Sequence, residues 1–269
     1  MSARAHAASL CAGLLAVALT PPTLAVTLTL TAEVTTPTVM MDGARVTGHA
    51  AEKIHEIMRR ARIDYSMATM TWKRAYTLAA TQPNPCVFMT TRTPDRDALF
   101  KWVGPISHSD WVLYGRAQRR YDFTTLEQAH GLRIGSYNGD SRGQYLAARG
   151  HAVEFVQNDE SNPKKLMLDR IDLWVNSTRS SRPLLASLGL TGKVVPMLTF
   201  QQVKVYLACH QATSGPLVAS MNAALHSMVA DGTYKAIETK FEHLQATTAS
   251  HQSERSSINS SFQHAVLRK

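Results

Sequence analysis

The sequence predicts an α/β fold of two lobes, each a three-layer arrangement around a mostly parallel sheet. Short runs typical of strands alternate with runs of helical periodicity, and this alternation favours parallel strands with helices on both faces. It occurs in two blocks, one at residues 26–89 and one at residues 132–230. The 269 residues suffice for two small domains, and we find no internal repeat of short period.

The first block opens with the stretch VTLTLTAEV at residues 26–34, where apolar and polar side chains alternate as in a strand. After a turn at Asp42-Gly43, the segment that follows Gly48 has an apolar stripe of helical spacing. The stripe consists of Ala51, Ile54, Ile57, Met58 and Ala61. The elements expected next are a strand at 65–70, a helix at 72–80 and a strand at 86–89.

The second block shows the same alternation and contains an Asn138-Gly139 turn. Its expected strands span residues 132–136, 153–156, 171–175 and 203–208. Its expected helices span residues 141–148, 163–168 and 217–230. In the last helix, the spacing predicts an inward face made of Val218, Met221, Leu225, Met228 and Val229.

Residues 1–25 have the pattern of a secretory signal peptide. Arg4 supplies a positive start, residues 7–19 form an apolar run too short to span a membrane comfortably, and Pro21 ends that run. Thr23-Leu24-Ala25 offers small residues for a cut after Ala25, so we expect an exported, periplasmic protein. An uncleaved membrane anchor is the alternative.

The C-terminal residues 244–269 differ from the rest of the chain in composition. They are rich in Ser, Thr, Gln and Ala and contain few large apolar side chains. Such a segment buries too little apolar surface to fold, so we expect a disordered polar tail.

The net charge of +9 raises the question of an anionic partner. The basic residues are scattered and form no run like a nucleic-acid-binding arm, so we expect no nucleic acid partner. We also expect no metal or other cofactor, because the sequence has no metal signature such as H-E-x-x-H. Cys86 and Cys209, the cysteines outside the signal segment, could form one disulfide or be two buried thiols.

Seven short pieces of the sequence occur in the order and spacing of one known family. They are Gly48 with Glu52, WKRAY at 72–76, Thr93-Pro94-Asp95-Arg96, FKWVGP at 100–105, LRIG at 132–135, LDRIDLW at 168–174 and DGTY at 231–234. From about residue 27 to 243, the chain thereby resembles the bacterial extracellular solute-binding proteins of family 3, the periplasmic receptors of amino-acid-type uptake systems.

The resemblance implies a periplasmic-binding-protein type II-like fold, with two three-layer α/β lobes joined by a two-strand hinge. By this resemblance, lobe one contains residues 26–112 and 204–243, and lobe two contains residues 113–203. It further implies a monomeric receptor that captures a small anionic solute, an amino acid or a carboxylate, between the lobes. An ABC permease in the inner membrane would be the partner.

In the resembled family, the arginine of the Thr-x-x-Arg motif grips the carboxylate of the solute, and Arg96 stands at that position. A guanidinium is always charged, and its planar fork matches a carboxylate in two parallel hydrogen bonds. Thr93 can cap a short helix with Pro94 at its first position, which would hold Arg96 on a rigid element. The alternative is a surface ion pair of Arg96 with a neighbouring aspartate.

Further candidate binding residues surround this motif and the Asn138-Gly139 turn. In lobe one, Thr91 and Trp72 are expected to contact the solute, while Arg92 and Arg74 could either line the cleft or form salt bridges. In lobe two, the turn before the expected helix would present free backbone N–H groups to an anion. The candidates there are Asp140, Ser141 and Arg142, and Asp140 or Ser141 could also cap the helix.

Two departures from the family pattern bear on the solute. Family members that bind α-amino acids usually carry an aspartate for the ammonium group where this chain has Ser177. The loop after the first strand often has an aromatic residue over the solute, whereas residues 34–37 read VTTP. An ordinary amino acid therefore fits the pattern poorly, and the excess of arginine favours a carboxylate or another anion.

Two other functions remain open from the sequence. Some members of the resembled family are enzymes that dehydrate cyclic acids, which requires a carboxylate as general acid or base. Glu33 and Asp140 are the candidates for that role, but neither has an assigned partner, so we expect a binding protein rather than an enzyme. The second is a sensor that takes no part in transport.

Overall fold

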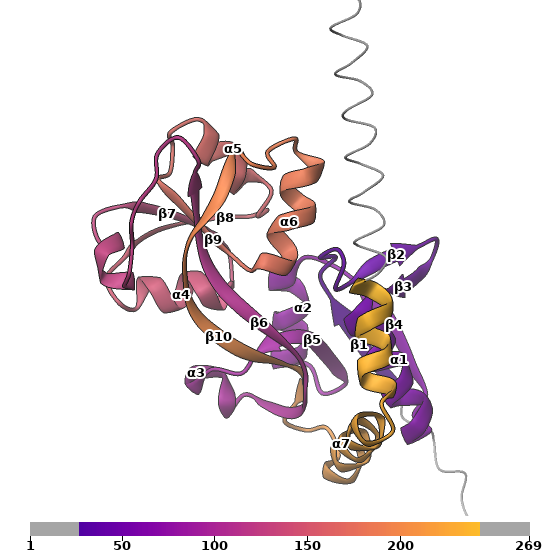
Figure 1. Cartoon of the computed structure of the whole chain (residues 1–269). Helices are drawn as coiled ribbons and strands as arrows, with labels where there is room; N and C mark the ends of the chain where they lie inside the picture. Colours follow the sequence, from indigo (N-terminus) through magenta and orange to yellow (C-terminus); the bar gives the residue numbers. More distant parts are fainter. Residues whose placement is uncertain (1–26, 243–269) are drawn as a thin grey trace, which may run out of the picture.

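The computed structural model describes residues 27–242, which form two α/β lobes joined by two long strands (Figure 1). The expected signal peptide at 1–25 and the expected tail at 244–269 lie outside the described residues. The long strands, β6 (Phe100–Arg116) and β10 (Val194–His210), pair antiparallel along their length. The expected lobe boundaries, between residues 112 and 113 and between residues 203 and 204, fall within these two strands and stay a prediction.

Each lobe contributes three strands to one sheet of order β4-β1-β5-β10-β6-β9-β7-β8. In lobe one these are β1 (Leu28–Ala32), β4 (Tyr65–Thr69) and β5 (Pro85–Thr91). In lobe two they are β7 (Arg133–Tyr137), β8 (Ala152–Val156) and β9 (Leu173–Asn176). The pairs within each set are parallel, as the alternation of elements predicts.

Helices cover both faces of the sheet in each lobe. In lobe one, α1 (His49–Ala61) and α7 (Gly215–Ala230) lie on one face and α2 (Trp72–Thr81) on the other. Phe88 of β5 packs with the first pair and Val87 with α2, because successive side chains of a strand point to opposite faces. In lobe two, α4 (Ser141–Ala147) and the 3₁₀ turn η1 (Leu126–Ala129) lie opposite α5 (Ser161–Met167) and α6 (Thr178–Ser187).

The sequence did not predict the hairpin of β2 (Met40–Asp42) and β3 (Arg45–Thr47), the helix α6, or a helix at 233–242. The short helix expected after Thr93 is present as α3 (Pro94–Asp97). Gly48 starts α1 with φ of 105°, and a Cβ there would lie 2.5 Å from the carbonyl oxygen of Thr38. A glycine is therefore required at the start of this helix.

The expected inward face of α7 is confirmed at Met221, Leu225 and Met228, which are buried in lobe one. The expectation for Val229 is wrong, because this side chain is 59% exposed. Residues of a helix follow one another at about 100° around its axis, so the residue after Met228 points away from the face that packs against α1.

Cys86 of β5 and Cys209 of β10 form a disulfide within lobe one. The two residues are direct neighbours in the antiparallel register, with Cα atoms 4.1 Å apart. The structure thus decides between the two alternatives that the sequence left open, and a disulfide fits an exported protein.

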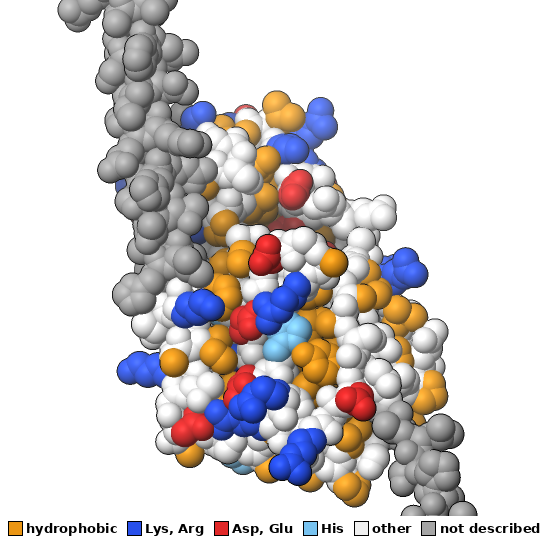
Figure 2. Space-filling model, turned by 90° about the vertical axis from the view of Figure 1, so that its right-hand side faces the viewer, with side chains coloured by type: hydrophobic (Ala, Val, Ile, Leu, Met, Phe, Trp, Pro, Cys, Tyr) orange, Lys and Arg blue, Asp and Glu red, His pale blue; other side chains and the backbone are white. Residues whose placement is uncertain are grey.

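Charged side chains are mixed on the face that Figure 2 shows. Lys and Arg side chains stand among acidic ones there and do not join into one basic surface. Within residues 27–242, no helix combines the length and the apolar character that crossing a membrane requires.

Candidate functional site

A cavity lies between the two lobes, and both lobes line it. Its volume for the centres of water-sized atoms is about 100 Å³. One water needs roughly 10–15 Å³ by this measure, so the cavity holds on the order of seven to ten such atoms. That is the size of a small metabolite.

The cavity lies where strands of both lobes end. Thr91 is the last residue of β5, Glu33 follows β1, Tyr137 is the last residue of β7, and Ser177 follows β9. Parallel strands of α/β sheets place their carboxyl ends at one edge, which is where such sheets bind ligands. The two edges face each other across the cleft.

Arg96 enters the cavity from α3 in lobe one and is 3% exposed. Its Nη2 donates to the carbonyl oxygen of Gly139 at 3.0 Å and to Oε1 of Gln144 at 2.8 Å, both in lobe two. Its guanidinium carbon lies 4.9 Å from the ring centroid of Tyr76. Among residues 27–242 Arg96 has no ion pair, so its charge is not neutralised there and its other N–H groups are available to a solute.

The segment that holds Arg96 begins as the sequence predicts. Thr93 is the extended residue before α3, and Pro94 occupies the first turn. The hydroxyl of Thr93 makes no capping hydrogen bond and is buried without a partner among the described residues. The expected side-chain cap is therefore wrong, while the backbone position and the proline are confirmed.

Trp72 contacts the same lobe-two turn as Arg96. Its indole Nε1 donates to the carbonyl oxygen of Gly139 at 2.8 Å. Gly139 has φ of 82°, and a Cβ on it would lie 3.2 Å from Cδ1 of Trp72. Two side chains of lobe one thus donate to one carbonyl oxygen of lobe two, and glycine allows both the turn and the close approach.

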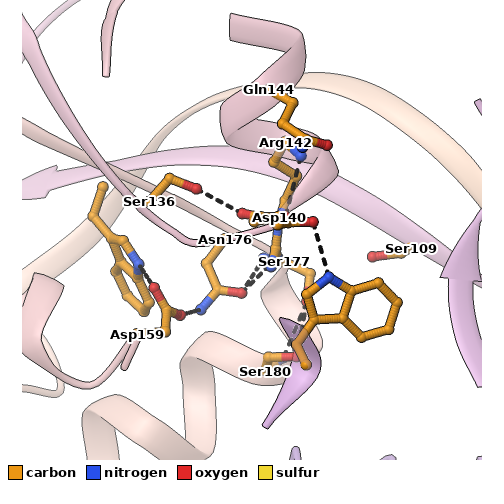
Figure 3. Close-up of polar contacts among 12 residues, drawn as sticks. Ser109, Ser136, Asp140, Arg142, Gln144, Asp159, Asn176, Ser177 and Ser180 are labelled. Atoms are coloured by element: carbon orange, nitrogen blue, oxygen red, sulfur yellow. Dashed lines mark hydrogen bonds and ion pairs between the residues drawn. The ribbon is translucent and has the colours of Figure 1, made fainter. Parts of the chain in front are cut away.

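Asp140 and Arg142 form a buried ion pair in lobe two (Figure 3). Asp140 caps α4, because its Oδ1 accepts from the backbone N of Arg142 at 3.1 Å, and it also accepts from Nε at 2.9 Å. Ser136 Oγ donates to its Oδ2 at 2.8 Å. Arg142 Nη1 donates to Oδ1 of Asn176 at 2.7 Å. The capping alternative for Asp140 therefore holds, and the charge of Arg142 is largely compensated.

Asp159 continues this network away from the cavity (Figure 3). Its carboxylate accepts from Nε1 of Trp174 at 2.9 Å, from Nδ2 of Asn176 at 3.0 Å and from Nδ2 of Asn162 at 2.9 Å. Burial raises its pKa to about 6, against the nearby positive charge of Arg142. Asp159 could not be predicted from the sequence, because Trp174 and Asn176 lie on the distant strand β9.

Glu33 and Arg179 also line the cavity, from lobe one and lobe two respectively. Glu33 accepts from the backbone N of Trp72 at 3.3 Å, and burial raises its pKa. Neither residue has an ion pair among residues 27–242. The sequence suggested Glu33 as a general acid or base and did not suggest Arg179, which lies on the unpredicted helix α6.

The structure brings most of the candidate residues from the sequence together. Those that line the cavity are Arg96, Thr91, Trp72, Asp140, Ser141 and Arg142. Arg92 instead pairs with Asp97 at 2.5 Å on the surface, and Arg74 lines a second, adjoining cavity of about 470 Å³. Ser177 caps α6 by accepting from the backbone N of Ser180. A role of any of these residues in binding stays a prediction.

The chain has two lobes with a cavity between them, which is the arrangement of two-lobed ligand-binding proteins. The model of the bacterial extracellular solute-binding proteins of family 3 matches residues 28–243 of the chain. The chain belongs to this family, which confirms the resemblance drawn from its sequence. No curated protein sequence matches it.

Solved structures of low sequence identity share the fold. A histidine kinase sensor domain similar to periplasmic binding proteins has a TM-score of 0.73 at 16% identity, covering 80% of this chain and 95% of that one. The arginine-, lysine- and histidine-binding protein ArtJ of Geobacillus stearothermophilus has 0.70 at 14%, covering 80% and 94%. The GluR0 ligand-binding core of Nostoc punctiforme with L-glutamate has 0.68 at 18%, covering 80% and 98%.

Proposed function

We propose that this protein is a periplasmic receptor that captures a small anionic solute, an amino acid or a carboxylate, between its lobes for ABC-type uptake. The observation that carries the proposal is Arg96, a buried guanidinium that faces the cavity without an ion pair among the described residues. A buried charge is costly unless a partner neutralises it. A carboxylate fits the planar fork that the remaining N–H groups present.

The charges around the cavity favour an anion over a cation. Arg96, Arg142 and Arg179 line it, but Asp140 neutralises Arg142. Arg96 and Arg179 then face the single uncompensated carboxylate of Glu33. A dicarboxylate fits this balance, and an acidic amino acid fits it as well if Glu33, rather than Ser177, receives the ammonium group.

The proposed partners follow from the family. Its extracellular members suggest a periplasmic location, with residues 1–25 as the export signal, and an ABC permease that receives the solute from a monomeric receptor. Capture would require the lobes to close by bending at β6 and β10, with contacts from both lobes selecting the closed arrangement. Trp72 and Arg96, which reach the Gly139 carbonyl, are the contacts that closure would form.

Native mass spectrometry of the purified mature protein tests the proposal. We expect the wild type to retain a small acid that is released on denaturation, and Arg96→Ala to retain none. Arg92→Ala, which changes a neighbouring surface arginine, should retain the acid as the wild type does. Retention of the same compound by Arg96→Ala, or retention of a compound without an acidic group, would contradict the proposal.

A sensor that takes no part in transport is the second candidate. The similarity to a histidine kinase sensor domain favours it, since that fold serves signalling in another protein. A permease gene beside the gene of this protein would support uptake, and a kinase gene there would support sensing. Chemical conversion of the retained acid would instead reveal an enzyme.

A further inference from the structure

His49 begins α1 in lobe one and contacts an arginine of lobe two. Its Nε2 lies 2.9 Å from Nη1 of Arg179 and 3.2 Å from Oγ1 of Thr38, and its side chain is buried. A guanidinium can only donate. In this contact Nε2 is the unprotonated acceptor, and the proton of the neutral ring lies on Nδ1, which is buried without a partner among the described residues.

The charged groups around His49 oppose a second proton on its ring. Burial lowers the pKa of His49 to about 3, and the positive charges of Arg179 and Lys53 add to this effect. Glu238, on the helix at 233–242, pairs with the Lys53 ammonium at 2.7 Å. Glu52 of α1 pairs with Arg45 on β3. No described carboxylate forms an ion pair with His49 itself.

Arg179 has N–H donors that are not used by other described residues. It lines the cavity from α6, opposite Arg96, and its one described hydrogen bond uses Nη1. Asp110 of β6 contacts the residue before Arg179, because it accepts from the backbone N–H and the hydroxyl of Thr178. Nη2 and Nε of Arg179 therefore remain for an anion, which the two lobes would hold between two guanidinium groups.

We propose that Arg179 is a second anion-binding residue of the cavity, that neutral His49 positions it from the opposite lobe, and that capture of the solute weakens when His49 takes up a proton. The proposal rests on the proposed function in requiring an anionic solute. Closing the lobes brings Arg179 to His49, and protonation of Nε2 would remove the acceptor and set two cations side by side.

The direction of the pH effect follows from the linkage between proton binding and closure. Burial is the main cause of the low pKa of His49, and the approach of Arg179 on closure lowers this pKa further, so the neutral ring favours the closed arrangement. The contribution of closure is present above the pKa that His49 has in the open arrangement and is lost as the pH falls toward about 3. The upper limit of the loss in affinity between pH 8 and pH 5 is about 30-fold, which corresponds to an open arrangement with the ordinary pKa of about 6.5.

Nitrogen-15 NMR of the imidazole rings, recorded with the copurified acid in saturating excess, tests the contact in the closed arrangement. The resonance of His49 is assigned by its loss in His49→Gln. We expect a neutral ring with its proton on Nδ1 down to pH 5, and a higher pKa in Arg179→Gln. Protonation of His49 near its ordinary pKa in the wild type, or a titration that Arg179→Gln leaves unchanged, overturns the proposed contact.

Retention of the copurified acid, counted by native mass spectrometry after dialysis at pH 8 and pH 5, tests the effect on binding. The wild type should keep the acid at pH 8 and lose it at pH 5. His49→Gln should keep it at both values, because Gln Oε1 can accept from Arg179 but does not titrate, whereas His49→Ala and Arg179→Ala should lose it at both. His108→Gln, which changes the histidine that lines the cavity itself, should keep the pH dependence.

Loss of the acid from His49→Gln at pH 5, as in the wild type, overturns the proposal. So does full retention by Arg179→Ala. A wild type that retains no acid at any pH contradicts the proposed function, on which this proposal rests.

Discussion

Arg96 in lobe one and Arg142 in lobe two line the same cavity but have opposite surroundings. Arg142 pairs with Asp140 at 2.9 Å and donates to Asn176 within its own lobe. Arg96 donates only to a carbonyl and an amide oxygen of the other lobe, and no described carboxylate neutralises it. The guanidinium of Arg142 has its partners within its own lobe, whereas the guanidinium of Arg96 has its partners in the opposite lobe.

The difference between Arg96 and Arg142 shows that lining the cavity does not by itself make a residue a binding residue. A compensated arginine stabilises the lobe that contains its partners, whereas an uncompensated one gains most when a ligand supplies the missing charge. The two arginines therefore have different roles, one in stabilising lobe two and one in contacts across the cleft. At this pair of residues, lobe two presents a preformed turn around Asp140, and lobe one brings the uncompensated Arg96 to it.

Replacing Arg142 should produce the largest effect, and it should appear in folding. Arg142→Met leaves Asp140 buried without its cation and removes a donor to Asn176. Breaking a buried pair on one side costs about 3–5 kcal/mol. We expect the free energy of unfolding, measured in urea by circular dichroism, to fall by that amount.

Arg133→Met is the matched control in the same lobe. Arg133 also pairs with an aspartate, Asp172, but its side chain is 46% exposed. An exposed pair contributes about 0–1 kcal/mol. Equal losses from both variants would show that Arg142 is an ordinary surface arginine and would remove the contrast with Arg96.

Replacing Arg96 should affect binding and leave folding nearly intact. Arg96→Ala leaves the anionic group of the solute unpaired, which costs about 2–5 kcal/mol, or about 30-fold to several thousand-fold in affinity. Arg96→Lys should also lose affinity, because a point charge does not reproduce the fork. Calorimetry with the acid that copurifies measures both.

Wild-type affinity in Arg96→Ala would show that Arg96 only joins the lobes through Gly139 and Gln144. A large loss of unfolding free energy in the same variant would show that it stabilises lobe one as Arg142 stabilises lobe two. Either result would remove the division of roles between the lobes.

The fold could be predicted from the sequence because its signals are local. Alternating residues such as those of β1, the stripe of α1 and the Asn138-Gly139 turn each act within a few residues. Contacts between distant residues gave no such signal. Lys53 is fully buried on α1, where Glu238 and the carbonyl oxygen of Ile106 bind its ammonium, and burial lowers its pKa to about 8.

The candidate site could be predicted only in part for the same reason. Arg96 and Asp140 belong to short motifs, and both line the cavity. Arg92 lies four residues before Arg96, ahead of α3, and its side chain pairs with Asp97 on the surface, which the sequence does not determine. Arg179 and Asp159 escaped prediction because their partners, His49 and Asn176, lie on other elements.

The disulfide gives lobe one a covalent link that the described part of lobe two lacks. Cys86 and Cys209 are 123 residues apart in the sequence, so the bond closes a long loop of the unfolded chain. Its removal typically costs about 2–4 kcal/mol. We expect the double variant Cys86→Ala/Cys209→Ala to lose this much unfolding free energy in urea.

A reducing agent sharpens this test. It should destabilise the wild type by a similar amount and leave the double variant unchanged. Two reactive thiols in the unreduced, unfolded wild type would show that the bond does not form, and lobe one would then have no covalent advantage over lobe two.

The smallest effect is expected at Arg92. Its replacement shows whether a positive charge near the cavity affects binding without contacting the solute. Its side chain is 45% exposed and pairs with Asp97, which is 52% exposed, in the same turn that carries Arg96. Water and salt screen such a pair, so Arg92→Ala should change the free energy of unfolding by about 0–1 kcal/mol. The difference should shrink further in 1 M salt, where charges are screened within about 3 Å. Calorimetry should give an affinity within about twofold of the wild type, since 0.4 kcal/mol corresponds to about that factor. A tenfold loss would mean that Arg92 turns toward the solute when the lobes close, and the fork of lobe one would then consist of two arginines.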